Sequence, residues 1–166
     1  MRWKFLVALV IAVVGIAVYV GDVRATPSGG QATSILAKSL FGQLEVNSHT
    51  IPADTWQTQL RTHGQSDVYV VDNTFAPGGT SGWHSHPGPS LIFVVGGTVT
   101  NYESSGGTCS THEYTAGSGF VDEGGGDVHM LRNNGTTPAE TIAVQFLPTG
   151  ATRRIDEPDP GTCPGQ

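Results

Sequence analysis

The 166-residue chain has few basic residues. Eight lysines and arginines stand against fourteen aspartates and glutamates, which gives a formal net charge of −6 at pH 7. Lysine is almost missing, since Lys4 and Lys38 are the only two. Nucleic acid binding depends on clustered basic side chains that neutralise phosphates. The sequence has no such cluster, which argues against a nucleic acid as partner.

Long helical patterns are also missing. No stretch of more than about ten residues has apolar side chains at the spacing of a helix. Instead, short segments rich in β-branched and aromatic residues recur about every ten residues, separated by glycine, proline and asparagine. This spacing predicts an all-β sandwich or barrel. The length suits a single domain.

The longest apolar run, Phe5 to Val20, follows the basic start Met1-Arg2-Trp3-Lys4. It leads to Val23-Arg24-Ala25, a small-x-small cleavage pattern, so residues 1–25 are predicted to be a secretory signal peptide. The alternative is an uncleaved membrane anchor, but such a run spans about 24 Å as a helix, less than the roughly 30 Å of a bilayer core. We therefore expect a secreted or extracytoplasmic protein that has no membrane contact beyond this segment.

Only two cysteines are present, Cys109 and Cys163. In an exported protein an even number of cysteines favours a disulfide. The bridge would tie a loop between strands to the C-terminal tail and stabilise the fold by about 3–4 kcal/mol. A pair of metal-binding or redox thiols is the alternative, against which the lack of a C-x-x-C motif counts.

The chain after the signal segment divides by composition. Residues 26–33 are small and polar and predict a linker, and residues 34–147 predict the folded domain. Residues 148–166 are rich in proline and predict an extended tail tied back by the disulfide. Ser34–Val46 has no clean period, and both an edge strand and a short helix over Ile35–Leu44 are compatible with it.

A stretch rich in glycine and proline, residues 78–90, carries His84 and His86. Side chains two apart on a strand point to the same face, so both imidazoles can reach one point. His129 lies on another apolar segment about forty residues later. Three imidazoles suit a divalent transition metal, Fe, Mn, Cu, Ni or Zn. The alternative is three hydrogen-bonded histidines that hold no metal.

These residues resemble two motifs of the cupin superfamily. The first motif, G-x5-H-x-H-x3-E-x6-G, is matched at Gly78, His84, His86 and Gly97, with Ser90 in place of the glutamate. The second, G-x5-P-x-G-x2-H-x3-N, is matched at Gly126, His129 and Asn133, with Gly124 in place of the proline. The resemblance covers about residues 65–147. It implies a small secreted cupin, a double-stranded β-helix (jelly-roll) barrel whose metal is held by His84, His86 and His129.

Two functions are compatible with these motifs. One is a metal-dependent, dioxygenase-like oxidoreductase acting on a small organic molecule, because three neutral imidazoles leave a metal open positions. The other is a non-catalytic exported protein that binds a small ligand, a sugar or a metal, and it is favoured by Ser90 in place of the glutamate, which removes an anionic ligand and a base. Several carboxylates near the motifs could supply a fourth ligand, but none has a spacing that singles it out: Glu103, Glu113, Asp122, Glu123 and Asp127.

Three more residues are expected at a ligand pocket. Trp83 could stack on a flat or sugar-like ligand, or else cover the barrel mouth. Ser90 and Gln145 could hydrogen-bond a bound molecule. Residues 91–95 are apolar on both faces, which predicts cover by N-terminal strands or by a second subunit. The resemblance likewise implies a homodimer.

Overall fold

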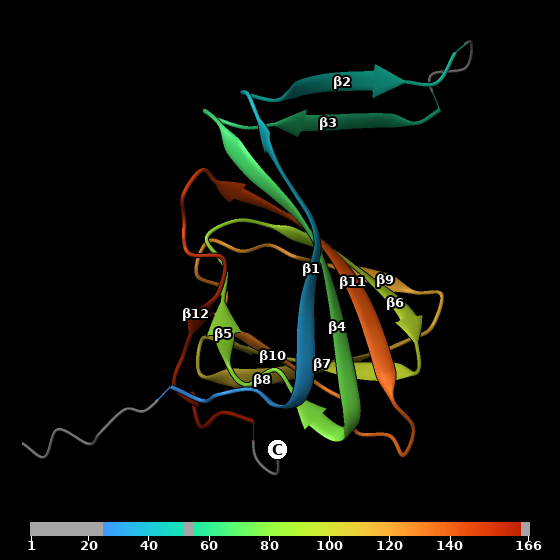
Figure 1. Ribbon diagram of the computed structural model, residues 1–166, viewed down its shortest axis with the longest axis vertical. Coiled ribbons are helices and arrows are strands. Elements are labelled where there is room, and N and C mark those ends of the chain that lie inside the picture. Colours follow the sequence, from blue (N-terminus) through green and yellow to red (C-terminus); the bar gives the residue numbers. More distant parts are fainter. Residues whose placement is uncertain (1–24, 52–54, 164–166) are drawn as a thin grey trace, which may run out of the picture.

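The computed structural model describes residues 25–51 and 55–163, and every helix or strand element within these ranges is a β-strand (Figure 1). The all-β prediction is confirmed. The predicted signal peptide falls, apart from Ala25, on residues 1–24, outside the described residues. In the part of the chain that the structure describes, no helix is long and apolar enough to cross a membrane.

The strands of the described residues follow in this order: β1 (Gly29–Phe41), β2 (Glu45–His49), β3 (Gln57–Arg61), β4 (Ser66–Thr80), β5 (His84–Ser85), β6 (Ser90–Gly96), β7 (Thr98–Ser105), β8 (Thr108–Thr115), β9 (Gly119–Asp122), β10 (His129–Arg132), β11 (Ala139–Pro148) and β12 (Ile155–Asp156).

Ten of these strands form one sheet that curves into a nearly closed barrel (Figure 1). The path runs β12-β5-β10-β4-β11-β6-β9, with β1 added to β4 and the β7–β8 hairpin added to β10. The antiparallel pair of β4 and β11 stays in unbroken register from Ser66–Pro148 to Phe75–Ala139 and forms one wall of the barrel. The remaining hairpin, β2–β3, projects from the barrel.

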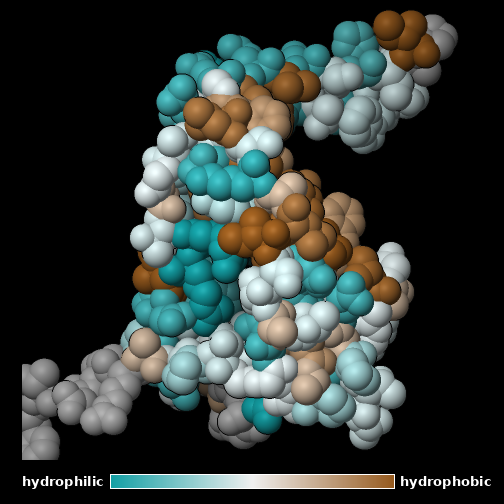
Figure 2. Space-filling view, viewed as in Figure 1, coloured by the Kyte–Doolittle hydropathy of each residue, from teal (hydrophilic) through white to brown (hydrophobic). Residues whose placement is uncertain are grey.

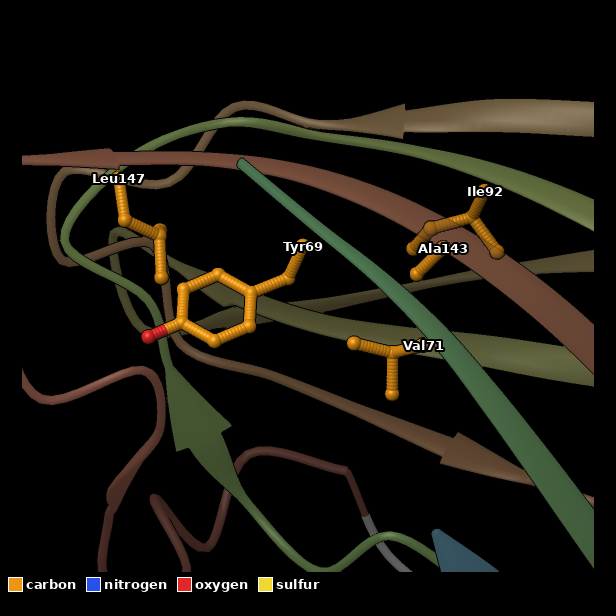
Figure 3. Packing of buried hydrophobic residues seen from close by; sticks show 5 residues of the cluster. All are labelled: Tyr69, Val71, Ile92, Ala143 and Leu147. Atoms are coloured by element: carbon orange, nitrogen blue, oxygen red, sulfur yellow. The ribbon is translucent and has the colours of Figure 1, made fainter. Parts of the chain in front are cut away.

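Alternation along β11 places every second side chain inside, as a half-buried strand requires. Two clusters of buried apolar side chains result. Figure 3 shows the first, which consists of Tyr69, Val71, Ile92, Ala143 and Leu147. The second consists of Phe75, Val94, Val99, Leu131 and Ala139. Burying each large apolar side chain contributes about 1.5–3 kcal/mol. The first cluster joins the neighbouring strands β4, β11 and β6, and the second also joins these strands to β7 and β10.

The predicted linker over residues 26–33 differs from the structure, in which β1 already begins at Gly29. β1 pairs along almost the whole of β4, from Gly29–Thr80 to Phe41–Ser66. Most of its side chains are exposed, so the strand is held mainly by backbone hydrogen bonds. Backbone pairing needs no apolar pattern, so the small polar residues gave no indication of this strand in the sequence. It also decides between the alternatives for Ser34–Val46 in favour of strand.

The apolar strand β6 has one buried and one exposed face. Its inward side chains join the core, whereas Leu91, Phe93 and Val95 are exposed, as is Val121 on the neighbouring β9. Figure 2 shows hydrophobic surface on this side of the barrel. No N-terminal strand among the described residues covers it, since β1 pairs with β4 instead. Cover by a second subunit stays a prediction.

Cys109 and Cys163 form a disulfide, as predicted. The bridge joins β8 to the tail, and Cys163 packs with Trp83 and Met130 in a third buried cluster. The tail also adds β12, which pairs with β5. The bridge therefore fixes the tail against the strand that carries His84.

We expect the double variant Cys109→Ala/Cys163→Ala to lose about 3–4 kcal/mol of unfolding free energy, because 54 residues separate the two cysteines. Urea denaturation of the oxidised protein and the variant measures the difference. Wild type reduced with a thiol is the matched control and should unfold at the same midpoint as the variant. An unchanged midpoint in both would contradict a stabilising bridge.

Candidate metal site

His84 and His86 are placed by β5 and the residue that follows it. β5 lies between β10 and β12, and His84 is paired with His129 of β10. Just before β5, Gly82 has a φ of 67°, and a Cβ there would collide with the carbonyl of Thr26. Only glycine fits this left-handed turn against neighbouring backbone. The turn sets the direction in which the histidine strand enters the barrel.

The structure brings the three predicted metal ligands together. One ring nitrogen of each lies within 4.8 Å of the others. Ring centroids are 4.4 Å apart for His84 and His129, 4.9 Å for His84 and His86, and 5.5 Å for His86 and His129. All three residues are buried, with no more than 6% of their surface exposed.

Backbone carbonyls set the orientation of the rings. Each Nδ1 lies beside one carbonyl oxygen: Gly82 at 2.9 Å for His84, Arg153 at 2.7 Å for His86 and Asp127 at 3.3 Å for His129. A carbonyl only accepts, so these partners assign the proton of each neutral ring to Nδ1. The lone pair is then on Nε2, the arrangement usual for a metal-binding histidine.

Two of the imidazoles, His84 and His86, are also held in their neutral form. Burial lowers the pKa of His84 well below its usual range. Burial likewise lowers the pKa of His86 to about 4, against the opposing effects of the Arg153 carbonyl and Asp122. Both rings are therefore unprotonated at neutral pH, which is the state that binds a metal ion.

A buried carboxylate, Asp122, faces the same space. It lies on β9 opposite Ser90 of β6, and its side chain is 2% exposed. Its Oδ2 is 3.8 Å from Nε2 of His86, and its Oδ1 is 3.8 Å from Nδ1 of His129. The Ser90 hydroxyl donates to Oδ2 at 3.1 Å, and the Gly124 N–H donates to Oδ1 at 2.9 Å.

Hydrogen bonds continue from Ser90 to the C-terminal tail. Nε2 of Gln145 donates to the Ser90 hydroxyl at 3.2 Å, and Nη1 of Arg153 donates to Oε1 of Gln145 at 3.1 Å. The backbone carbonyl of the same arginine accepts the Nδ1 proton of His86. The tail is thus part of the site as well as an attachment to the barrel.

A cavity of about 90 Å³ lies beside the imidazoles. Its wall is largely polar and, besides the histidines, includes Asn73, Ser90, Gln145, Arg153 and Arg154. Figure 2 shows a hydrophilic hollow between β1 and β12 at this place. Pockets for drug-sized ligands have volumes of roughly 300–1,000 Å³, so this cavity suits a molecule of few non-hydrogen atoms.

The predicted pocket residues divide into two groups. Ser90 and Gln145 line the cavity, where they hydrogen-bond to one another. Trp83 does not line it, and its buried ring packs in the third cluster instead. Because side chains alternate along an extended chain, Trp83 points away from the face that His84 occupies. The two-residue period could have shown this from the sequence.

Sequence reasoning missed the part that Asp122 and Arg153 have in the site. Asp122 was only one of several acidic residues near the motifs, and its place follows from its pairing with Ser90. Arg153 belongs to a proline-rich tail that had no strand pattern. The adjacent arginines 153 and 154, in a chain with so few basic residues, were the available signal.

The donor set fits a transition-metal ion. Imidazole nitrogens with a carboxylate suit Fe, Mn, Ni, Cu and Zn, whereas calcium and magnesium prefer oxygen ligands. Among the described residues, no lysine or arginine forms an ion pair with Asp122. A bound cation would provide the counter-charge that this buried carboxylate lacks.

Known proteins share this architecture. The family model described as Cupin domain matches residues 71–145. No curated protein matches the chain significantly. An uncharacterised conserved protein from Klebsiella pneumoniae with a double-stranded β-helix domain is 20% identical, with a TM-score of 0.51, over 79% of this chain and 87% of that one.

Two enzyme structures align over a shorter part. An oxalate oxidase is 26% identical over 54% of this chain and 45% of its own, with a TM-score of 0.47. The oxalate decarboxylase of Lactobacillus farciminis is 22% identical over 54% of this chain and 26% of its own, also with a TM-score of 0.47. The chain thus spans less than half the length of either enzyme. The match to the family model identifies residues 71–145 as a cupin domain, and the Klebsiella protein shares its fold.

Proposed function

We propose that this cupin binds one divalent transition-metal ion, Fe, Mn, Cu, Ni or Zn, through His84, His86 and His129. The observation that carries the proposal is the convergence of three buried imidazoles whose Nδ1 protons face backbone carbonyls. Their Nε2 lone pairs are free to bind the ion. A bound ion would supply a Lewis acid with open positions for substrate or oxygen.

The proposed reaction is an oxidation of a small organic molecule that carries an anionic group. Arg153 lines the cavity, and its side chain forms a hydrogen bond to Gln145 but no ion pair with a carboxylate among the described residues. The hydroxyl of Thr141, buried in the same wall, has no hydrogen-bond partner in the described part of the chain. A guanidinium and a free hydroxyl together suit the oxygens of a carboxylate.

The alternative is an exported binding protein without catalysis. One observation favours it: apart from the three histidines, whose Nε2 atoms would bind the ion, the described cavity wall holds no group that could act as a base at neutral pH. Asp122 already accepts hydrogen bonds on both carboxylate oxygens, from Ser90 and Gly124. The two arginines of the wall remain protonated.

Export is part of both proposals. The disulfide is of the kind that persists outside the cytoplasm, and the sequence of residues 1–25 has the pattern of a signal peptide. The Cys109–Cys163 bridge fixes the tail that carries Arg153, so an oxidising compartment is where the site would be complete.

Metal content is the first measurement. We expect protein purified from its export compartment to contain about one equivalent of a transition metal by elemental analysis, and His84→Ala/His129→Ala to contain almost none, because two of three imidazoles are gone. His63→Ala/His112→Ala, which removes two exposed histidines, is the matched control and should keep its metal. Absence of metal from wild type even after reconstitution would exclude the proposal.

Oxygen consumption separates the two functions. We expect metal-loaded wild type to consume oxygen with a small carboxylate, and Arg153→Gln to raise the KM for it, because the guanidinium that pairs with the anion is lost. A screen of small organic acids with an oxygen electrode measures this. Saturable ligand binding without turnover throughout the screen would establish the binding protein.

Apoprotein stability should fall as the solution is acidified from about pH 6.5 to pH 4. In this window unfolded histidine takes up a proton, whereas folded His86, with a pKa of about 4, does not, so protons favour the unfolded state. His86 alone would contribute a loss of about 3 kcal/mol. Urea denaturation along this pH range measures it. His86→Asn should flatten the dependence, while His112→Asn at an exposed site should leave it as in wild type.

A further inference from the structure

Asp122 is a charged group in an unusual position. Its side chain is 98% buried by the barrel, where an ionised carboxylate is costly unless a positive group or several donors compensate it. Among the described residues, its hydrogen-bond partners are one hydroxyl and one backbone N–H, both neutral. The nearest groups that could carry positive charge are the rings of His86 and His129, each at 3.8 Å.

Neither ring forms a hydrogen bond with Asp122, since 3.8 Å is longer than a hydrogen bond. Their Nδ1 atoms face the backbone carbonyls of Arg153 and Asp127 instead, which leaves each Nε2 free of a hydrogen-bond partner among the described residues. Oδ2 of Asp122 lies beside that free Nε2 of His86. Two groups with lone pairs thus face each other across a short gap, an arrangement that a cation between them would stabilise.

Neighbouring side chains fix the direction of the carboxylate. A guanidinium only donates, so Arg153 takes the amide oxygen of Gln145, and the amide nitrogen of Gln145 then donates to the Ser90 hydroxyl. The hydroxyl proton is therefore left for Oδ2 of Asp122. This series of hydrogen bonds makes Oδ2 of Asp122 an acceptor and keeps the carboxylate directed at the histidines.

Resting on the metal proposed above, we infer that Asp122 is a fourth ligand of the same ion, through Oδ2. Ser90 and Gln145 are positioning residues, which hold that carboxylate without contacting the ion. The site then carries one negative charge and three neutral nitrogens, so a divalent ion keeps a net charge of +1 to attract an anionic molecule.

Substitution of Asp122 should have opposite effects on the metal-free and the metal-bound protein. Without metal, Asp122→Asn removes a buried charge that lacks a counter-ion, so the apoprotein should melt several degrees higher. With metal, the same change removes a ligand, so the increase in melting temperature on metal addition should be smaller than in wild type. If the carboxylate has a purely structural role, Asp122→Asn should lower the melting temperature in both states.

The test uses Co²⁺ and Zn²⁺ as probe ions on apoprotein. Competition with a chelator gives the Zn²⁺ affinity, and the Co²⁺ absorption spectrum reports the ligand set. We expect Asp122→Asn to weaken Zn²⁺ binding by more than about 100-fold, beyond the 10–100-fold typical of groups that only orient a ligand, and to change the Co²⁺ spectrum. Ser90→Ala should weaken binding by about tenfold and keep the spectrum.

Two further variants make the test specific. Asp127→Asn is the matched control, because Asp127 is the other carboxylate near His129, and we expect less than about a threefold change in affinity. Ser90→Asp/Asp122→Ser moves the carboxylate to the opposite strand, since the two residues are cross-strand partners. This double variant should bind Zn²⁺ at least about tenfold more tightly than Asp122→Asn does. That result would show that a carboxylate at this place binds the ion.

The outcomes distinguish this inference from the proposed function. Wild type that binds neither ion would refute the metal site itself. Wild-type affinity and an unchanged Co²⁺ spectrum in Asp122→Asn would refute the role of Asp122 while leaving the three histidines as ligands. Loss of binding in Asp127→Asn with normal binding in Asp122→Asn would assign the carboxylate to Asp127 instead.

Discussion

The site depends on the removal of water from three imidazoles and one carboxylate in the same small space. Burial keeps His84 and His86 neutral, and backbone carbonyls then decide which nitrogen of each ring carries the proton. The same burial leaves Asp122 with neutral donors only. In water none of these side chains would have a fixed direction. The barrel therefore creates the electrostatic conditions of the site as well as its geometry.

Backbone pairing places these groups from distant parts of the chain. β5 and β10 bring His84 opposite His129, and β6 and β9 bring Ser90 opposite Asp122. The wall formed by β4 and β11 adds Gln145. The buried apolar side chains of this wall keep the strands in register. A shift of one residue would turn these side chains outward. The apolar packing that fixes the register therefore also keeps the side chains of the site inside the barrel.

The fold class and the three histidines could be predicted because both follow from local patterns. Strand-forming segments at regular intervals predict a β-barrel, and a two-residue spacing puts His84 and His86 on one face. Asp122 and Arg153 could not be selected in this way, since their places depend on strand register and on the path of the tail. β1 was missed at Gly29–Thr33 because its pairing relies on backbone rather than on side chains. Trp83 was misplaced although the alternation that directs His84 inward also directs Trp83 away from it.

The tail gives the site an order of assembly. His86 and the Arg153 carbonyl that accepts its proton are 67 residues apart along the chain. During synthesis the histidine emerges first, and for that interval its tautomer is free. On the proposed metal binding, an ion that arrived in this interval would meet flexible imidazoles with little selectivity, whereas an ion that arrived after the tail had closed would meet fixed ones. The compartment in which the Cys109–Cys163 bridge forms would then determine which metal supply the finished site encounters.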